Sequence, residues 1–413
     1  MNKECITYYK YNTLGAIMYI KNIILKISFM SLILFNSVSI SNSADTIKVG
    51  TLLPYSGVYT VLGEEITNAM ILAFDEVGNS ISGKNIEIIK GDTEVKPNIA
   101  LQKARKLISS NKVDILVGPV SSSVALAVRN LVVQSKTPLI IPNAGANVLT
   151  GEKCSKFITR ISFSNHQINA PMGTWLANKS GIKSAFLLAP DYAAGKEMMK
   201  AFKTNFEAAG GKILGEEYTP FRKTKDFGPY LARVKNSGAD AVYVFYAGGE
   251  AINFIKQAKS FGLGEVMKLT GAGWTTSPLF IPAQKEAAIG FIGSLNYVPS
   301  INTEENKAFI KAYKDKFGRA PSEFAVQGYD SGKVIIKAVE SLSGNIKDKD
   351  KLAEAISSVS IIGPRGPLTI DPRTNNVIQN IYIFEVVNGD QGPELKVLDT
   401  IEAVKSPGEG CNL

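Results

Sequence analysis

Three consecutive serines at positions 121–123 have the residue types and spacing best suited to a binding site. They follow a short apolar run, residues 113–117, and the apolar spacing of residues 124–132 predicts a helix that begins at the serines. The first N–H groups of a helix have no partner within it, and with serine hydroxyls they offer uncharged donors to an anion. Serine residues at the start of a helix also commonly cap it. Capping and anion binding are compatible, because a capping side chain satisfies only some of these N–H groups.

A second loop of small residues, 142–145, follows another apolar run, 139–141. Together with the preceding strand and helix, this run predicts a parallel β-α-β unit, whose two loops lie at the same edge of the sheet. We therefore expect backbone N–H groups near Ala144 and Gly145 to lie close to Ser121 and Ser122. Neither loop holds an acid, base or nucleophile with a partner, so the pattern favours anion binding over catalysis.

Other catalytic patterns are incomplete. Residues 78–84 match most of a phosphate-binding loop, but Asn85 replaces the magnesium-binding Ser or Thr, and a predicted strand follows where that motif needs a helix. His166 is the single histidine, and no Gly-x-Ser-x-Gly elbow occurs. We therefore expect no enzymatic activity, no cofactor and no metal site.

The length of 413 residues, with 45% hydrophobic and 20% charged residues, is typical of a globular chain of two domains. The net charge is +9, and it would be +6 without residues 1–44. The positive charges are spread along the chain without a basic run or interleaved aromatics. We therefore expect no nucleic-acid partner.

Residues 1–44 are predicted to be a secretory signal peptide. Lys21 and Lys26 precede an apolar run, 27–35, and small residues at 41–44 suggest cleavage near Ser43 or Ala44. The basic end is long, which suggests that translation starts at Met18. An uncleaved membrane anchor is the alternative, although the apolar run is short for a membrane span.

Export would leave two cysteines, Cys154 and Cys411, because Cys5 lies in the predicted signal peptide. Two cysteines in an exported chain suggest one disulfide. Two buried free thiols are the alternative.

The rest of the chain repeats one plan. Strands are predicted at 46–53, 85–89, 113–117 and 139–141, and again at 183–188, 213–218 and 239–246. Helices are predicted between them at 63–77, 97–108, 196–209 and 227–236. Later strands at 291–297, 364–371 and 381–387 and helices at 304–317 and 323–342 do not simply extend the second half. We predict an α/β fold with two Rossmann-like lobes.

Five segments resemble the leucine/isoleucine/valine-binding family of type I periplasmic substrate-binding proteins: residues 48–57, 62–65, 117–122, 191–195 and 327–330. The resemblance implies two lobes joined by a three-strand hinge near residues 160–164, 291–297 and 380. The first lobe would hold residues 45–161 and 297–378, and the second 162–296 and 379–413. It also implies a monomeric periplasmic protein that closes on a ligand and delivers it to an ABC permease of the inner membrane.

The resemblance assigns Ser122 to the ligand carboxylate and Tyr192 to an aromatic wall on the second lobe. Two departures concern the ligand class. Amino-acid binders of the family carry Thr or Ser at the position of Gly145, and an acid for the ammonium group at the position of Gly273. A bound ammonium group without that acid would be desolvated and unpaired.

Aromatic residues could replace those amino-acid contacts. Residues 162–167 and 191–195 look like the branch of the family that binds aromatic carboxylates, and a planar ring would suit the flat side chains. Each aromatic could equally belong to the core, and His166 could donate to a ring hydroxyl or pack at the hinge. The predicted ligand-binding residues are Ser56, Leu62, Ser121, Ser122, Ala144, Gly145, Phe163, Ser164, His166, Tyr192, Tyr246, Ala247 and Trp274.

These expectations describe a periplasmic substrate-binding protein of an ABC importer for a small carboxylate, preferentially an aromatic acid of the benzoate, hydroxybenzoate or hydroxycinnamate type. A branched-chain or other amino-acid binder is the main alternative, with Glu250 or Asp191 as the acid. A receptor sensor domain would need a membrane span or signalling domain after the lobes, and none is expected in this chain.

Overall fold

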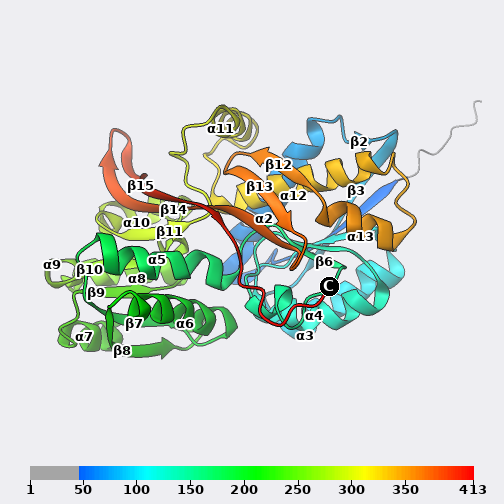
Figure 1. Cartoon of the computed structure of the whole chain (residues 1–413). Helices are drawn as coiled ribbons and strands as arrows, with labels where there is room; N and C mark the ends of the chain where they lie inside the picture. Colours follow the sequence, from blue (N-terminus) through cyan, green and yellow to red (C-terminus); the bar gives the residue numbers. More distant parts are fainter. Residues whose placement is uncertain (1–45) are drawn as a thin grey trace, which may run out of the picture. The chain divides into compact units, whose positions relative to one another are not determined.

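The structure, a computed structural model, describes residues 46–413, so the predicted signal peptide lies outside the described residues. Within residues 46–413, no helix is long and apolar enough to cross a membrane. The first lobe is built on five parallel strands in the order β3-β1-β4-β5-β6, with the two-residue β2 on the outer edge (Figure 1). Its early elements are β1 (Ile47–Leu53), η1 (Gly57–Tyr59), α2 (Thr60–Asp75), β2 (Ser80–Ile81), β3 (Lys84–Asp92), α3 (Pro97–Arg105), η2 (Lys106–Ser110), β4 (Ile115–Val117), α4 (Ser122–Ser135), β5 (Leu139–Ile141), η3 (Asn147–Thr150) and β6 (Ile158–Arg160).

The second lobe repeats this arrangement with parallel strands in the order β11-β10-β9-β7-β8. Its elements are α5 (Asn165–Lys179), β7 (Ser184–Pro190), α6 (Ala193–Ala208), β8 (Lys212–Thr219), α7 (Gly228–Asn236), β9 (Ala241–Val244), α8 (Gly249–Ser260), α9 (Leu263–Val266), β10 (Lys268–Ala272), η4 (Gly273–Thr276), α10 (Ile281–Gln284), η5 (Lys285–Ala288) and β11 (Ile292–Leu295).

One long strand, β14 (Asn376–Gly389), lies between the two halves of the sheet. Its start pairs with β6 of the first lobe, and its later residues pair antiparallel with β11 of the second. The chain therefore crosses between the lobes three times, after β6, after β11 and within β14.

The elements between β11 and β14 pack with those of the first lobe. They are α11 (Glu304–Phe317), α12 (Glu323–Ser341), α13 (Lys349–Ser357), β12 (Ser360–Gly363) and β13 (Gly366–Asp371). Helix α12 packs closely on α2. A Cβ added at Gly328 would stand only 2.7 Å from the Cα of Ile66, so this close contact requires glycine. Strand β13 pairs antiparallel with the start of β14.

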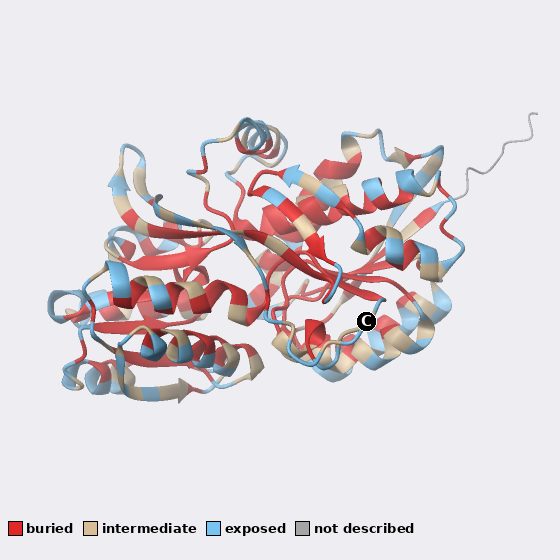
Figure 2. Ribbon diagram, in the orientation of Figure 1, coloured by how far each residue is buried: buried red, intermediate tan, exposed pale blue. Residues whose placement is uncertain are grey.

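The central strands are buried on both faces, which explains their unbroken apolar sequences. Successive side chains of a strand point to opposite faces. In β4, Ile115 and Val117 therefore pack in the cluster that includes Ile335 of α12, whereas Leu116 packs in the cluster with Val128 of α4. Figure 2 shows buried strands beneath helices whose outer faces are exposed.

The C-terminal tail joins the two lobes a further time. Strand β15 (Gly392–Val404) pairs with β14, after which the tail turns back to the first lobe. A disulfide joins Cys411 to Cys154, with their Cα atoms 5.5 Å apart. The later residues of β14 and the strand β15 thus lie with the second lobe. The last residues of the chain lie against the first lobe near η3.

Candidate ligand-binding site

A narrow pocket lies where the carboxyl ends of the parallel strands of both lobes meet, the position at which open α/β sheets bind ligands. Its walls leave about 350 Å³ of unfilled space, including the part open to solvent. The lining residues are Tyr59, Leu62, Val120, Ser122, Asn143, Gly145, Phe163, Asn165, Tyr192, Ala194, Met198, Phe245, Ala247, Trp274 and Phe324.

The start of α4 contributes the uncharged donors of the first lobe. Ser121 is the N-cap residue, but its side chain makes no capping bond, and its buried Oγ has no partner within residues 46–413. Ser122 lines the pocket, and its Oγ accepts a hydrogen bond from Asn165 Nδ2 at 3.4 Å. Because capping does not engage Ser121, helix capping does not explain this pair of serines.

The loop after β5 contributes Asn143 and Gly145. The Ala144 N–H, which we expected to be free for the ligand, instead donates to the Pro119 carbonyl at 3.0 Å. Asn143 Nδ2 donates to Gln327 Oε1 at 2.8 Å, which holds the amide at the pocket wall. Only Gly145 of the two predicted loop residues therefore lines the pocket.

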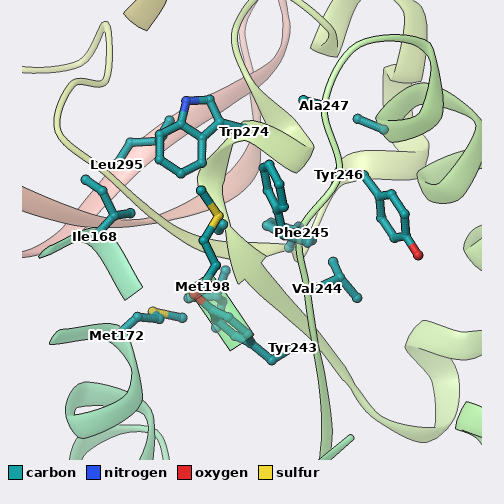
Figure 3. Close-up of a cluster of buried hydrophobic side chains, with 14 of the residues drawn as sticks. Ile168, Met172, Met198, Tyr243, Val244, Phe245, Tyr246, Ala247, Trp274 and Leu295 are labelled. Atoms are coloured by element: carbon teal, nitrogen blue, oxygen red, sulfur yellow. The ribbon is translucent and has the colours of Figure 1, made fainter. Parts of the chain in front are cut away.

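Aromatic side chains form the deep part of the pocket. The rings of Phe163 and Trp274 have centroids 4.5 Å apart, and Phe245 stands at 82° to Trp274 with centroids 6.0 Å apart. Figure 3 shows Trp274, Phe245 and the Met198 side chain gathered in one cluster. The Trp274 Nε1 is buried and has no hydrogen-bond partner among the described residues. This cluster combines flat apolar surface with one spare donor.

A pair of tyrosines from opposite lobes lies at the pocket wall. The hydroxyls of Tyr59 and Tyr192 are hydrogen-bonded to each other, and burial raises the pKa of both. Tyr192 stacks on Phe221 with centroids 3.9 Å apart and an interplanar angle of 5°. These hydroxyls are therefore protonated at neutral pH and act as neutral hydrogen-bonding groups.

None of the pocket-lining residues is Asp or Glu. Glu250 accepts a hydrogen bond from the Thr224 N–H at 3.2 Å, outside the pocket, and burial raises its pKa. Asp191 pairs with Lys196 on the surface. Neither acid proposed for an amino-acid ligand therefore faces the pocket.

Six predicted site residues lie outside the pocket lining. Ser56 is the N-cap residue before η1, Ser121 and Ala144 are outside the lining although Ser122 and Gly145 belong to it, and Ser164 accepts from the Gln167 N–H to cap α5. His166 faces two other cavities, beside the C-terminal tail and α5. Tyr246 is wholly buried in the second lobe against Phe227 and Phe254.

Most of the residues that line the pocket without having been predicted follow strand ends, as the predicted ones do, whereas Met198 and Phe324 lie within α6 and α12. Phe245 lines the pocket where its neighbour Tyr246 was predicted to do so, because adjacent residues of an extended segment point to opposite sides. A shift of one residue from Tyr246 could have found it. The others are Tyr59, Val120, Asn143, Asn165, Ala194, Met198 and Phe324, for which we found no sequence signal beyond their positions.

The fold is that of a two-lobed α/β protein with a pocket lined by residues of both lobes. The chain belongs to the periplasmic binding protein family, whose sequence model matches residues 46–391. Proteins of this family bind small molecules, and those of ABC transporters work with a permease; the family implies a periplasmic location. The family and fold expected from the sequence are therefore confirmed.

Individual relatives give two kinds of description. The chain is 30% identical over 390 residues to a "Leu/Ile/Val-binding protein homolog 6" of Brucella melitensis, covering 93% of this chain and 98% of that one. A solute-binding protein of an R. palustris ABC transporter, solved in complex with benzoate, is 35% identical with a TM-score of 0.84, covering 89% and 100%. Another from Rhodopseudomonas palustris BisB5, solved with 3,4-dihydroxy benzoic acid, is 35% identical with a TM-score of 0.84, covering 88% and 99%.

Proposed function

We propose that this chain is the periplasmic substrate-binding protein of an ABC importer for an aromatic carboxylate of the benzoate or hydroxybenzoate type, and that it acts by binding and not by catalysis. The observation that carries the proposal is a pocket with uncharged donors at one wall, aromatic rings at another and no acidic side chain in its lining. The two R. palustris proteins that bind benzoate and 3,4-dihydroxy benzoic acid support the same ligand class.

In this proposal the carboxylate lies against Ser122, the first N–H groups of α4 and the backbone of Gly145. The ring lies between the Phe163–Trp274 pair and Phe245. A hydrogen bond to an ionised group contributes about 1.5–3 kcal/mol, so Ser122→Ala should weaken binding roughly 10- to 150-fold. Trp274→Ala should also abolish most of the affinity, because it removes the aromatic wall.

A branched-chain amino acid is the second candidate, since the Brucella relatives carry that name. It requires a partner for the ligand ammonium group. The desolvated ammonium would lose several kcal/mol without an acid, and the pocket lining has none. The aromatic acid is therefore the better candidate.

The test is a ligand panel followed by thermal unfolding and calorimetry. The panel contains benzoate, 4-hydroxybenzoate, 4-hydroxycinnamate, a 2-oxo acid, leucine and benzamide, which has the ring of benzoate without its charge. We expect stabilisation by the aromatic acids and none by leucine or benzamide. Tyr246→Phe serves as a control variant outside the pocket, and stabilisation by leucine alone would overturn the proposal. Light scattering should give the mass of a monomer with and without ligand.

A further inference from the structure

Two hydrogen-bonded side chains, Asn165 and Glu197, line two different cavities. Asn165, fully buried at the start of α5, lines the ligand pocket. Glu197, half-buried on α6, lines the other cavity, beside η3 and the C-terminal tail. Asn165 Nδ2 donates to Glu197 Oε2 at 2.7 Å. Glu197 is therefore one hydrogen bond away from the ligand pocket.

Glu197 also joins the two lobes. The same Oε2 accepts a hydrogen bond from the Asn147 N–H at 2.9 Å. Asn147 begins η3 of the first lobe, whereas Glu197 lies on α6 of the second. The Asn165 N–H adds a second contact by donating to the Gly145 carbonyl at 2.6 Å. The arrangement of Asn165 thus depends on both lobes being in contact.

The third link is Ser122. Its Oγ accepts from Asn165 Nδ2, the same nitrogen that donates to Glu197. A serine hydroxyl has one O–H to donate. Because Ser122 acts as acceptor toward Asn165, its O–H stays available for an acceptor in the pocket, and a carboxylate is such an acceptor.

We propose that Glu197 is a positioning residue for the ligand carboxylate: on closure of the lobes it orients the Asn165 amide, which leaves the Ser122 hydroxyl free to donate to the ligand. The inference rests on the proposed function only in requiring a ligand with a carboxylate. It assigns a role in binding to a residue that does not line the ligand pocket.

The surroundings of Glu197 make this contact sensitive to pH. Burial raises the pKa of Glu197, whereas the bonds from Asn147 and Asn165 and the charges of Arg160 and Lys200 lower it. The Arg160 guanidinium is fully buried and donates to the Ala146 carbonyl at 2.6 Å, to Asn376 and to Thr150. Other titratable groups around Glu197 are Glu152, His166 and Glu409 in the same cavity and Tyr192 on the pocket side.

The sign of the pH effect follows from burial. We expect that parting of the lobes exposes Glu197 to water, so that its pKa returns towards the ordinary value. Closure raises the pKa of Glu197, so the closed form holds a proton more tightly than the open form. Ligand affinity should therefore rise as pH falls from the pKa of Glu197 in the closed form to its pKa in the open form. A glutamine at 197 cannot titrate but keeps a carbonyl oxygen that accepts from Asn147 and Asn165.

The experiment compares Glu197→Ala, Glu197→Gln and His166→Asn by calorimetry with benzoate between pH 8 and pH 5.5. We expect Glu197→Ala to weaken binding at least about tenfold, since it removes the acceptor. Glu197→Gln should bind within about threefold of the wild type at the pH where the wild type binds most tightly, and it should lose the pH dependence. His166→Asn should keep the wild-type profile, because the substitution retains the backbone N–H that donates to Asn147 Oδ1 at 2.9 Å, and the His166 Nδ1 makes no hydrogen bond among the described residues.

Wild-type affinity in Glu197→Ala overturns the inference, as does a Glu197→Gln variant that binds as weakly as Glu197→Ala. If Glu197→Ala does not fold, the pH profile of Glu197→Gln decides: a profile that persists there, or disappears in His166→Asn, also overturns it. If the protein binds leucine and not benzoate, the proposed aromatic ligand is refuted but the role of Glu197 is not. The affinities of the variants are then measured with leucine, which also carries a carboxylate. No binding to any carboxylate of the panel refutes both proposals.

Discussion

Gly145→Ala is the substitution that tests most directly how tightly the lobes close around the pocket. A Cβ at position 145 would stand 2.7 Å from Phe163 Cε2 and 2.9 Å from Asn165 Cγ, and closer still to Asn165 Oδ1. The Gly145 backbone does not have a left-handed conformation. The obstacle is therefore the neighbouring side chains and not the backbone.

The cost should fall on closure more than on folding. Gly145 belongs to the first lobe, whereas Phe163 and Asn165 lie where the chain enters the second. Overpacking of a well-packed site by one methyl group costs about 1–3 kcal/mol. If the open form relieves the overlap, the cost appears as a loss of affinity of roughly 5- to 150-fold, because each 1.4 kcal/mol is tenfold.

Calorimetry with benzoate and thermal unfolding of the ligand-free protein separate the two effects. We expect the weaker affinity together with a nearly unchanged unfolding temperature without ligand. Gly249→Ala is the matched control, since a Cβ at that glycine meets nothing within 4 Å. Unchanged affinity in Gly145→Ala, or an equal loss in Gly249→Ala, would refute the reasoning.

Three further predictions concern buried charge and the tail. In the wild type the buried Asp330 carboxylate lies 2.6 Å from Arg365 Nε, and Arg365→Met leaves it without this partner. Urea unfolding should show that the free energy of unfolding falls by about 3–5 kcal/mol. A loss below about 1 kcal/mol contradicts this. Burial raises the pKa of Glu323 to about 8, so its contribution to stability is complete below its unfolded pKa and disappears as pH rises towards 8. Urea midpoints at pH 5 and 8 should therefore differ more in the wild type than in Glu323→Gln, and equal pH dependence argues against it. Cys411→Ser opens a loop with a sequence separation of 257 residues and should cost up to about 5 kcal/mol; a reductant should lower the unfolding temperature of the wild type but not of the variant, and insensitivity of the wild type would show that the disulfide adds no stability.

Elements with local signals could be predicted well from the sequence. Strands β4 and β5 are short apolar runs bounded by Gly or Pro, and α11 was predicted at its observed bounds, residues 304–317. In each case the apolar period and the end signals lie within the same few residues. Such elements need no information from the rest of the fold.

Helix α5 was missed for a tertiary reason. It is buried on most of its circumference and includes polar Asn169 among its buried residues, so an apolar stripe is absent. Pro171 lies inside the helix, where a sequence reading expects a break. The capping box of Ser164 and Gln167 marks the start of this helix, and packing against α6 of the same lobe buries much of the rest.

The candidate site was predicted in part for a similar reason. Ser122, Gly145 and Trp274 follow strand ends and line the pocket. Asn165 and Phe245 were not predicted, because the side chain that faces the pocket depends on the direction of the backbone beyond each strand. That direction is set by contacts with the other lobe, such as the bond from the Asn165 N–H to Gly145.

The glycine at position 273 shows why the ligand class follows from packing as well as from residue type. The resemblance placed the ammonium-binding acid of amino-acid binders at this position. A Cβ there would stand 2.7 Å from Phe384 Cε1 and 2.8 Å from the Ser294 carbonyl, and still closer to Leu295. A side chain at 273 would therefore enter the core beneath β11 and β14, while the next residue, Trp274, faces the pocket. An acid cannot be restored here by a single substitution, because the backbone that brings the indole into the pocket leaves no room for a carboxylate beside it.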